Sequence, residues 1–191
     1  MFNHMTLDGV MQAPGRPDED RRDGFTHGGW AAGRMDSVMG EVTQEAMASR
    51  ASLLFGRFTY EGFAGFWPKQ TDNPFTEVLN GAQKYVASRT LTDPLPWQNS
   101  TLLKGDAAEA VGRLKKTAEK DLVILGSGEL IQSLMSHRLI DRFVLMIHPV
   151  VLGTGRRLFR DGAAVSTLKL VDSRPSTTGV VIATYELAAD N

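Results

Sequence analysis

Three short segments of the chain combine arginine, hydroxyl and glycine residues directly after apolar runs that are predicted to be buried strands. They are residues 56–61 (GRFTYE), 88–91 (SRTL) and 126–130 (GSGEL). In an open α/β sheet, ligands bind beyond the carboxyl ends of the parallel strands. We therefore expect the three segments to line one rim of a sheet, where a ligand could bind.

The glycine-rich segment has the features of a phosphate-binding turn. Gly126, Ser127 and Gly128 allow a tight turn, and Glu129 and Leu130 begin a predicted helix. Backbone N–H groups and the helix dipole at such a helix start favour a pyrophosphate. A G-x-G sequence after a strand more often serves simple strand–helix packing, and the lack of a full G-x-G-x-x-G pattern argues against a Rossmann domain.

Arg57 and Arg89 each begin a turn after a predicted strand. A guanidinium group offers forked donors to a phosphate and can stack on an adenine. Either arginine alone would be interpreted as an ordinary solvated side chain. Two of them on the same rim as a glycine-rich turn favour a site for an adenosine 2′-phosphate, and hence NADP rather than NAD. The hydroxyl groups of Thr59, Ser88 and Thr90 could add donors.

Asp8 is the candidate for contact with a substrate, because it stands beside Gly9 where the first predicted strand ends. Its carboxylate could orient or polarise a substrate ring, or it could satisfy its own backbone, as aspartates in Asp-Gly turns commonly do. His27 and Trp30 belong to a glycine-rich loop that either covers a site or packs on the surface. His148 is interpreted as structural.

The composition excludes several classes of site. The 191 residues carry a net charge of −1, so no overall field attracts nucleic acid or an anionic membrane. There is no cysteine, which excludes disulfides, thiolate catalysis and cysteine-based zinc sites, and the four histidines show no metal-ligand spacing. No apolar run reaches the roughly 18 residues of a membrane span, and no secretory leader is visible. We expect a cytoplasmic protein without a metal.

The elements that must position these residues alternate between strands and helices. Helices are predicted at residues 36–49, 59–67, 107–120 and 129–136, and strands at 2–5, 51–55, 85–87, 101–103, 122–125 and 142–147. Two last strands, at 167–172 and 180–187, predict a hairpin. The order favours one α/β domain over residues 1–191, with a mostly parallel sheet and an antiparallel edge. The strand at 2–5 is short for a central strand, either by nature or because the sequence begins inside it.

Six motifs occur in an order that resembles a known family. They are TLDG (6–9), GRFTYE (56–61), FWP (66–68), KYVASRTL (84–91), VILGSGEL (123–130) and HPVVLGTGRRLF (148–159). The sequence resembles a stand-alone member of the dihydrofolate-reductase-like family that includes the reductase domain of the bifunctional riboflavin-biosynthesis deaminase/reductase. Each motif alone is modest, but the six together extend over essentially the whole chain.

The resemblance implies a three-layer α/β/α sandwich with NADPH as the hydride donor. It assigns the adenosine and its 2′-phosphate to Arg57, Thr59, Ser88, Arg89 and Thr90. It assigns the pyrophosphate to Gly126, Ser127, Gly128, Glu129 and Leu130. Val150, Leu152 and Gly153 would pass near the nicotinamide ribose, and Asp8 would face the substrate.

The chain departs from the riboflavin reductases in three respects. It lacks the Cys/His zinc signature of the deaminase half, and residues 30–33 (WAAG) stand where those enzymes commonly have Trp-Ile-Thr-Gly. Those enzymes also usually lack the arginine found here at position 57. The helix that carries the substrate-binding acid in dihydrofolate reductases offers only Asp36, Glu41 and Glu45.

We therefore expect an NADPH-dependent reductase of a small heterocyclic substrate, resembling the 5-amino-6-(5-phosphoribosylamino)uracil reductase of riboflavin biosynthesis. Because the cofactor carries the chemistry, such an enzyme needs no strong acid–base signature. A non-catalytic NADP(H)-binding protein and a dihydrofolate or pterin reductase are the alternatives. A phosphate-ester hydrolase fits poorly, since neither a nucleophile constellation nor metal ligands are visible.

A homodimer is expected for two reasons. The strand-rich C-terminal third leaves an edge strand that a second copy could cover. Relatives of the family that the chain resembles are commonly dimeric.

Overall fold

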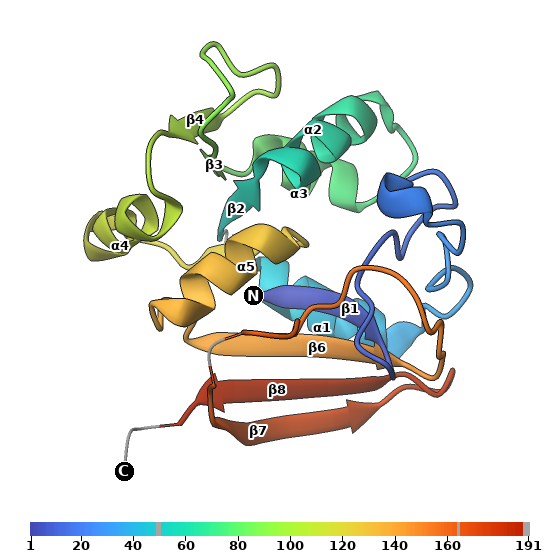
Figure 1. The fold of residues 1–191 in the computed structure, drawn as a ribbon. Coiled ribbons are helices and arrows are strands. Elements are labelled where there is room, and N and C mark those ends of the chain that lie inside the picture. Colours follow the sequence, from blue (N-terminus) through green and yellow to red (C-terminus); the bar gives the residue numbers. More distant parts are fainter. Residues whose placement is uncertain (49–50, 164, 189–191) are drawn as a thin grey trace. The chain divides into compact units, whose positions relative to one another are not determined.

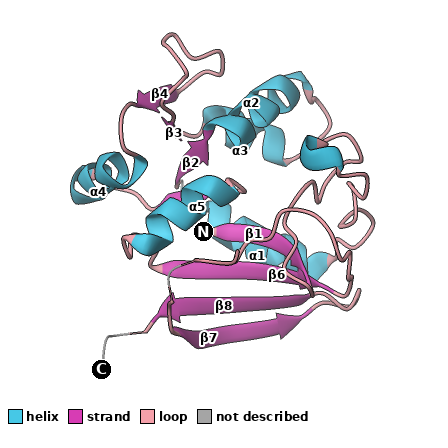
Figure 2. Cartoon of the chain, in the orientation of Figure 1, coloured by secondary structure: helices cyan, strands magenta, loops and turns pink. Residues whose placement is uncertain are grey.

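The computed structural model describes residues 1–48, 51–163 and 165–188. The chain divides into two compact units, unit 1 with Met1–Gln44 and Ile140–Asn191 and unit 2 with Glu45–Leu139. Each unit contains a four-stranded sheet (Figures 1 and 2). One domain over residues 1–191 stays a prediction.

Unit 2 is built on a fully parallel sheet with the strand order β4-β3-β2-β5. Its strands are β2 (Ser52–Gly56), β3 (Lys84–Ala87), β4 (Ser100–Leu103) and β5 (Leu122–Ile124). Leu53, Leu54 and Phe55 are consecutive and all almost completely buried. Such a run is typical of a strand inside a parallel sheet, which has no solvent face. The four predicted strands of this unit are confirmed to within one residue at each end.

In unit 2, helices follow β2, β4 and β5, whereas a loop joins β3 to β4. These helices are α2 (Arg57–Phe66), the 3-10 turn η2 (Trp67–Lys69), α3 (Phe75–Gly81), α4 (Ala107–Thr117) and α5 (Gly128–Ser136). Asp106 caps α4 as expected, since its Oδ1 accepts the N–H of Glu109 at 3.0 Å. The helix ends three residues before the predicted end, because Ala118 is extended. The sequence did not predict α3, which at seven residues is too short to show a helical period.

Unit 1 has a mixed sheet with the strand order β1-β6-β8-β7. Its strands are β1 (Phe2–Thr6), β6 (Arg142–His148), β7 (Leu168–Pro175) and β8 (Val181–Leu187). β1 pairs with β6 in parallel, and β8 runs antiparallel to both of its neighbours, which confirms the predicted C-terminal hairpin.

After β1 the chain forms η1 (Arg22–Gly24) and α1 (Ser37–Ala48), and the boundary between the two units falls inside α1, after Gln44. Asp36 precedes α1, and its carboxylate accepts the N–H of Met39 at 2.9 Å and the N–H of Thr177 at 2.6 Å. The carboxylate therefore ties the start of α1 to the turn between β7 and β8. The predicted helix at 36–49 is confirmed as far as residue 48, and Ser49 lies outside the described residues.

A buried lysine holds together the loops at the start of the sheet in unit 2. The Lys84 side chain is fully buried, and its Nζ donates to the backbone oxygens of Asn80 at 3.1 Å, Ala82 at 2.7 Å and Gln98 at 3.1 Å. The ammonium group also lies 4.4 Å from the centre of the Trp97 ring. Burial lowers the pKa of Lys84 to about 8. Three carbonyls and one aromatic face thus replace the water that this cation has lost.

We expect Lys84→Met to lower the free energy of unfolding by about 1–3 kcal/mol, because the substitution leaves buried carbonyl oxygens without their donor. Urea denaturation followed by circular dichroism measures the change. The exposed Lys69 provides the control, and Lys69→Met should change stability by no more than about 0.5 kcal/mol. Equal stabilities of the two variants would show that the three contacts contribute nothing.

Within the described ranges, no helix is both long and apolar enough to span a membrane.

Candidate functional site

The glycine-rich turn after β5 has an unusual backbone. Gly126 and Ser127 both adopt the left-handed conformation, with φ of 59° and 66°, and α5 begins at the next residue. Two successive left-handed residues reverse the chain within one turn. Gly126 adopts this conformation without strain, whereas Ser127 adopts it at a conformational cost. The turn therefore aims the start of α5, with its backbone N–H groups, at the carboxyl end of the sheet in unit 2.

Hydrogen bonds fix this turn to the junction between β2 and α2. The Ser127 Oγ accepts the N–H of Gly56 at 2.9 Å, and the Ser127 N–H donates to Thr59 Oγ1 at 3.0 Å. A Cβ atom at Gly126 would lie 3.2 Å from Thr59 Cγ2, so the side chain of Thr59 fills the space that the glycine leaves. Thr59 and Ser127 consequently act first as the support of the turn, whatever ligand the turn binds.

The ends of β2 and β3 bring the predicted arginine and hydroxyl residues together. β2 pairs with β3 so that Gly56 stands opposite Ala87, and Arg57 Nη1 donates to Thr90 Oγ1 at 3.2 Å. The buried Ser88 Oγ accepts the N–H groups of Thr90 at 3.1 Å and of Leu91 at 3.0 Å. Arg57 lies in the first turn of α2, two residues inside the region predicted as loop.

Two exposed arginines, Arg57 and Arg89, lie at this rim, and Arg57 is only weakly paired. The Arg57 Nε lies 3.9 Å from the Glu61 carboxylate, and both side chains are about half exposed. An exposed ion pair at this distance is loose and contributes little to stability. Arg89 is exposed on the same turn as Ser88 and Thr90. In α5, Glu129 is exposed and Leu130 is buried beneath Gly56, so the two residues differ in their access to a ligand.

In unit 1, the Asp8 carboxylate holds the loop that follows β6. Its Oδ1 accepts the Thr6 hydroxyl at 2.6 Å and the N–H of Leu152 at 3.2 Å, and its Oδ2 accepts the N–H of Gly153 at 2.8 Å. The hydrogen bond from Thr6, followed by those from the two backbone groups, lowers the pKa of Asp8. The carboxylate therefore stays ionised and positions residues 150–153.

The loop around Asp8 contains the three residues that the resemblance placed near the nicotinamide ribose, Val150, Leu152 and Gly153. Val150 is tied to the same turn, since its backbone oxygen accepts the N–H of Leu7 at 2.9 Å. The Arg157 Nε donates to the backbone oxygen of Asp8 at 2.9 Å. Asp8 can both support the backbone and contact a substrate, because a carboxylate that supports this loop can also contact what the loop binds.

Sequence reasoning missed a pair of histidines in unit 1. The His4 Nδ1 and the His148 Nε2 lie 2.9 Å apart, and the Trp30 ring stands nearly perpendicular to the His148 ring at 5.2 Å. Burial lowers the pKa of each histidine to about 4, so both are neutral at pH 7. Side chains at positions 2, 4 and 6 of a strand point to the same face of the sheet. Because Thr6 stands opposite His148, His4 lies on the same face as His148.

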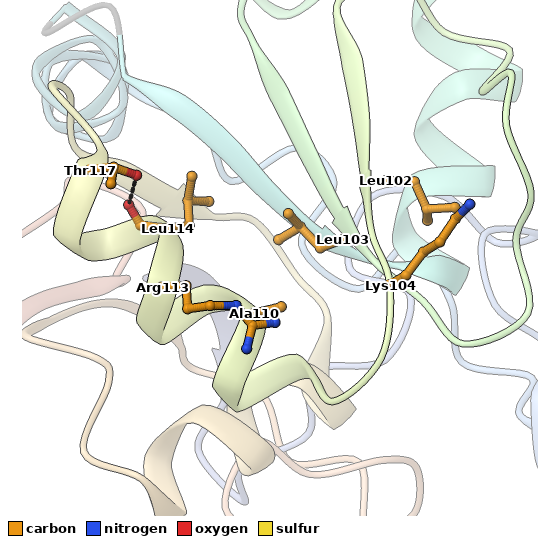
Figure 3. Close-up of a pocket in the computed structure, with 7 residues that line it drawn as sticks. All are labelled: Leu102, Leu103, Lys104, Ala110, Arg113, Leu114 and Thr117. Atoms are coloured by element: carbon orange, nitrogen blue, oxygen red, sulfur yellow. Dashed lines mark hydrogen bonds between the residues drawn. The ribbon is translucent and has the colours of Figure 1, made fainter.

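A hollow of about 360 Å³ in unit 2 lies between β4 and α4 (Figure 3). It is lined by Leu102, Leu103, Lys104, Ala110, Arg113, Leu114 and Thr117. Lys104 pairs with Asp93 at 3.6 Å and extends away from α4, and Arg113 pairs with Glu109 at 3.6 Å. Its two cations do not converge, so this hollow is a weaker phosphate site than the rim at Arg57.

Within the described ranges, no group of three or more His, Asp or Glu side chains could hold a metal ion.

The family model of the RibD C-terminal domain matches residues 1–182 of this chain. The chain belongs to the RibD C-terminal domain family. Among curated relatives, it is 36% identical over 140 residues to the uncharacterized protein YyaP of Bacillus subtilis, covering 70% of this chain and 72% of that protein. It is 27% identical over 110 residues to the uncharacterized protein YwjB of the same organism, covering 49% and 63%.

Solved structures of similar fold cover nearly the whole of this family member. A putative riboflavin biosynthesis protein from Shewanella sp. PV-4 superposes with a TM-score of 0.70 at 22% identity, over 98% of this chain and 97% of the other. Dihydrofolate reductase from Enterococcus faecalis, solved with NADP(H) and RAB-propyl, gives a TM-score of 0.64 at 14% identity, over 98% and 95%. These likenesses confirm the predicted dihydrofolate-reductase-like α/β fold.

Proposed function

We propose that this protein is an NADPH-dependent reductase of a small heterocyclic substrate, of the aminopyrimidine class that is reduced in riboflavin biosynthesis. One observation carries the proposal. The weakly paired Arg57 and the left-handed turn that leads into α5 are joined through the same β2–α2 junction. An anion-binding helix start and an adjacent guanidinium group are the two donors that an adenosine dinucleotide with a 2′-phosphate requires.

The donor set of unit 2 fits NADPH. Arg57 and Arg89 would hold the 2′-phosphate, with the hydroxyl groups of Ser88 and Thr90 beside them. Backbone N–H groups at the start of α5 would hold the pyrophosphate, and the rigid turn at Gly126 and Ser127 would keep them in place. When it is bound, NADPH supplies the hydride.

The residues of unit 1 would serve the substrate. Asp8 keeps the N–H groups of Leu152 and Gly153 in fixed positions, and its ionised carboxylate could accept a hydrogen bond from an amino group of the heterocycle. Positioning of this kind is a sufficient role for the protein, because orientation alone removes a large part of a reaction barrier.

A turnover assay tests the proposal. The purified protein is mixed with NADPH and, in turn, with an aminopyrimidine, a dihydropterin and dihydrofolate, and loss of the reduced nicotinamide absorbance is followed. We expect steady oxidation with the aminopyrimidine. Tight NADPH binding without turnover on any acceptor would favour a non-catalytic NADP(H)-binding protein, and turnover confined to the folate or the pterin would favour that reductase class.

We also expect the protein to form a homodimer through the β7 edge of unit 1. Leu170 and Val171 on β7 are both about half exposed, and β7 pairs only with β8 in the described sheet. An exposed edge strand that carries apolar side chains is usually covered, and a second copy is a common cover. Light scattering at micromolar concentration should give about twice the mass of the chain.

Leu170→Glu should shift that mass to the monomer value. The exposed Val78, on α3 of unit 2, provides a matched control, and Val78→Glu should leave the dimer intact. A wild-type protein that is monomeric at micromolar concentration would contradict the expected homodimer.

A further inference from the structure

The imidazole pair of unit 1 is built into the face of its sheet. β1 and β6 run in parallel with Thr6 opposite His148, so His4 and His148 project to the same side. Their rings lie 5.2 Å apart with one nitrogen–nitrogen contact of 2.9 Å. His148 is fully buried beside Trp30, while His4 is partly exposed. Only His4 of the two can therefore meet a ligand.

The surroundings of His148 fix where the protons of the pair lie. The Nδ1 of His148 is buried and has no hydrogen-bond partner within the described ranges. Buried N–H groups without an acceptor are rarer than buried acceptors without a donor, so this nitrogen carries the lone pair. The proton of His148 is then on Nε2 and is donated to the Nδ1 of His4. It follows that His4 carries its own proton on Nε2.

The electrostatics keep the pair uncharged. Burial is the largest cause that lowers the pKa of His148, and the charges of His4 and Arg34 lower it further. Burial alone lowers the pKa of His4. The other ring against His4 is Phe2, whose centre lies 6.2 Å away and which has no charge. A neutral pair holds no extra proton to give at pH 7, so its chemistry is hydrogen bonding and not general acid catalysis.

We propose that His4, with its tautomer set by His148, is a ligand-binding residue that donates a hydrogen bond from Nε2–H to an uncharged acceptor on the substrate. The Nε2 atom has no partner within the described part of the chain, and it is not among the fully buried polar atoms. A neutral donor suits a ring carbonyl oxygen or a pyridine-type nitrogen and offers no charge to a phosphate or carboxylate. The inference rests on the proposed function for the heterocyclic nature of the ligand.

Nitrogen NMR of the full-length protein labelled with ¹⁵N-histidine tests both parts of this inference. In the free protein, His4 and His148 should both show the neutral Nε2–H tautomer at pH 7. Titration with 5,6-diaminouracil, which carries two ring carbonyls, should shift the Nε2 signal of His4. The exposed His137, whose Nδ1 lies 2.9 Å from the backbone oxygen of Ser133, is the internal control and should not shift.

Two variants measure the contribution of the donor. His4→Phe should weaken 5,6-diaminouracil binding by roughly three- to tenfold, the effect of one neutral hydrogen bond. His4→Gln, which keeps an N–H donor, should recover most of that loss. An Nδ1–H tautomer at His4, or a His4 signal unchanged up to the solubility limit of the probe, would overturn the inference even in a protein that oxidises NADPH. A shifted His4 signal without NADPH oxidation would overturn only the proposed reductase function.

Discussion

Replacing Arg57 by alanine is expected to weaken NADPH binding by roughly ten- to a hundredfold while leaving NADH binding nearly unchanged. A charge-assisted hydrogen bond to a phosphate contributes ~1.5–3 kcal/mol, which corresponds to that factor in affinity. Arg57 is available for such a contact, since the Glu61 carboxylate is 3.9 Å away and the pair is about half exposed. Fluorescence titration of both nucleotides against the wild type and the variant measures the ratio of NADPH affinity to NADH affinity in each protein.

The chain supplies a matched control for this prediction. Arg113 is an exposed arginine on α4 of the same unit, and it too pairs with a glutamate one helical turn away, Glu109, at 3.6 Å. Arg113→Ala removes the same charge from the hollow between β4 and α4 and should leave the NADPH affinity unchanged. A loss of affinity in the Arg113 variant, or an equal loss for NADPH and NADH in the Arg57 variant, would contradict the role of the rim.

The second large effect is expected from Asp8→Asn, which should lower turnover by about a hundredfold and leave NADPH binding nearly intact. The substitution replaces one carboxylate oxygen by an amide nitrogen, which cannot accept the N–H groups of Leu152 or Gly153. Displacement of a positioning loop by about 1 Å can cost a factor of about 100 in rate. Steady-state kinetics with the best acceptor, together with NADPH titration, separates the two quantities.

Asp36 is the control for Asp8, because it ties two backbone segments of the same unit by the same means. Its carboxylate accepts the N–H groups of Met39 and Thr177, and the hydroxyl of Thr177. Asp36→Asn should lower stability without changing turnover. If Asp8→Asn only destabilises the fold, like its control, then Asp8 is a turn residue alone. A loss of NADPH affinity as large as the loss of turnover would mean that Asp8 serves cofactor binding and not the substrate.

The sequence was informative about the strands because their signals are local. Every strand predicted in the described ranges is present, since buried runs such as residues 52–56 show their environment directly in their composition. The parallel order then fixed which strand ends are neighbours, so Arg57 and Thr90 could be predicted to share a rim. The start of α2 was placed two residues late, because Gly56, its cap residue, carries no capping side chain to mark it.

Contacts between distant segments could not be predicted in the same way. Two of the partners of Asp8 are backbone N–H groups more than 140 residues away, and the sequence does not reveal which backbone groups a side chain will bind. The pairing of His148 with His4 could not be predicted, because the two residues are 144 positions apart and have no fixed spacing. Lys84 looked like any strand lysine, and only the loops around Asn80 and Gln98 show why it is buried.

Calorimetric titration of the wild-type protein with NADPH and with NADH is the most direct test of the central claim, that unit 2 binds a 2′-phosphorylated dinucleotide. We predict that NADPH binds at least ~10-fold more tightly than NADH, as one charge-assisted contact to the phosphate requires. The advantage should decline as the salt concentration rises, because Arg57 is partly exposed. Equal affinities for the two nucleotides would contradict the role of the 2′-phosphate, and no binding of either would contradict the proposed reductase function altogether.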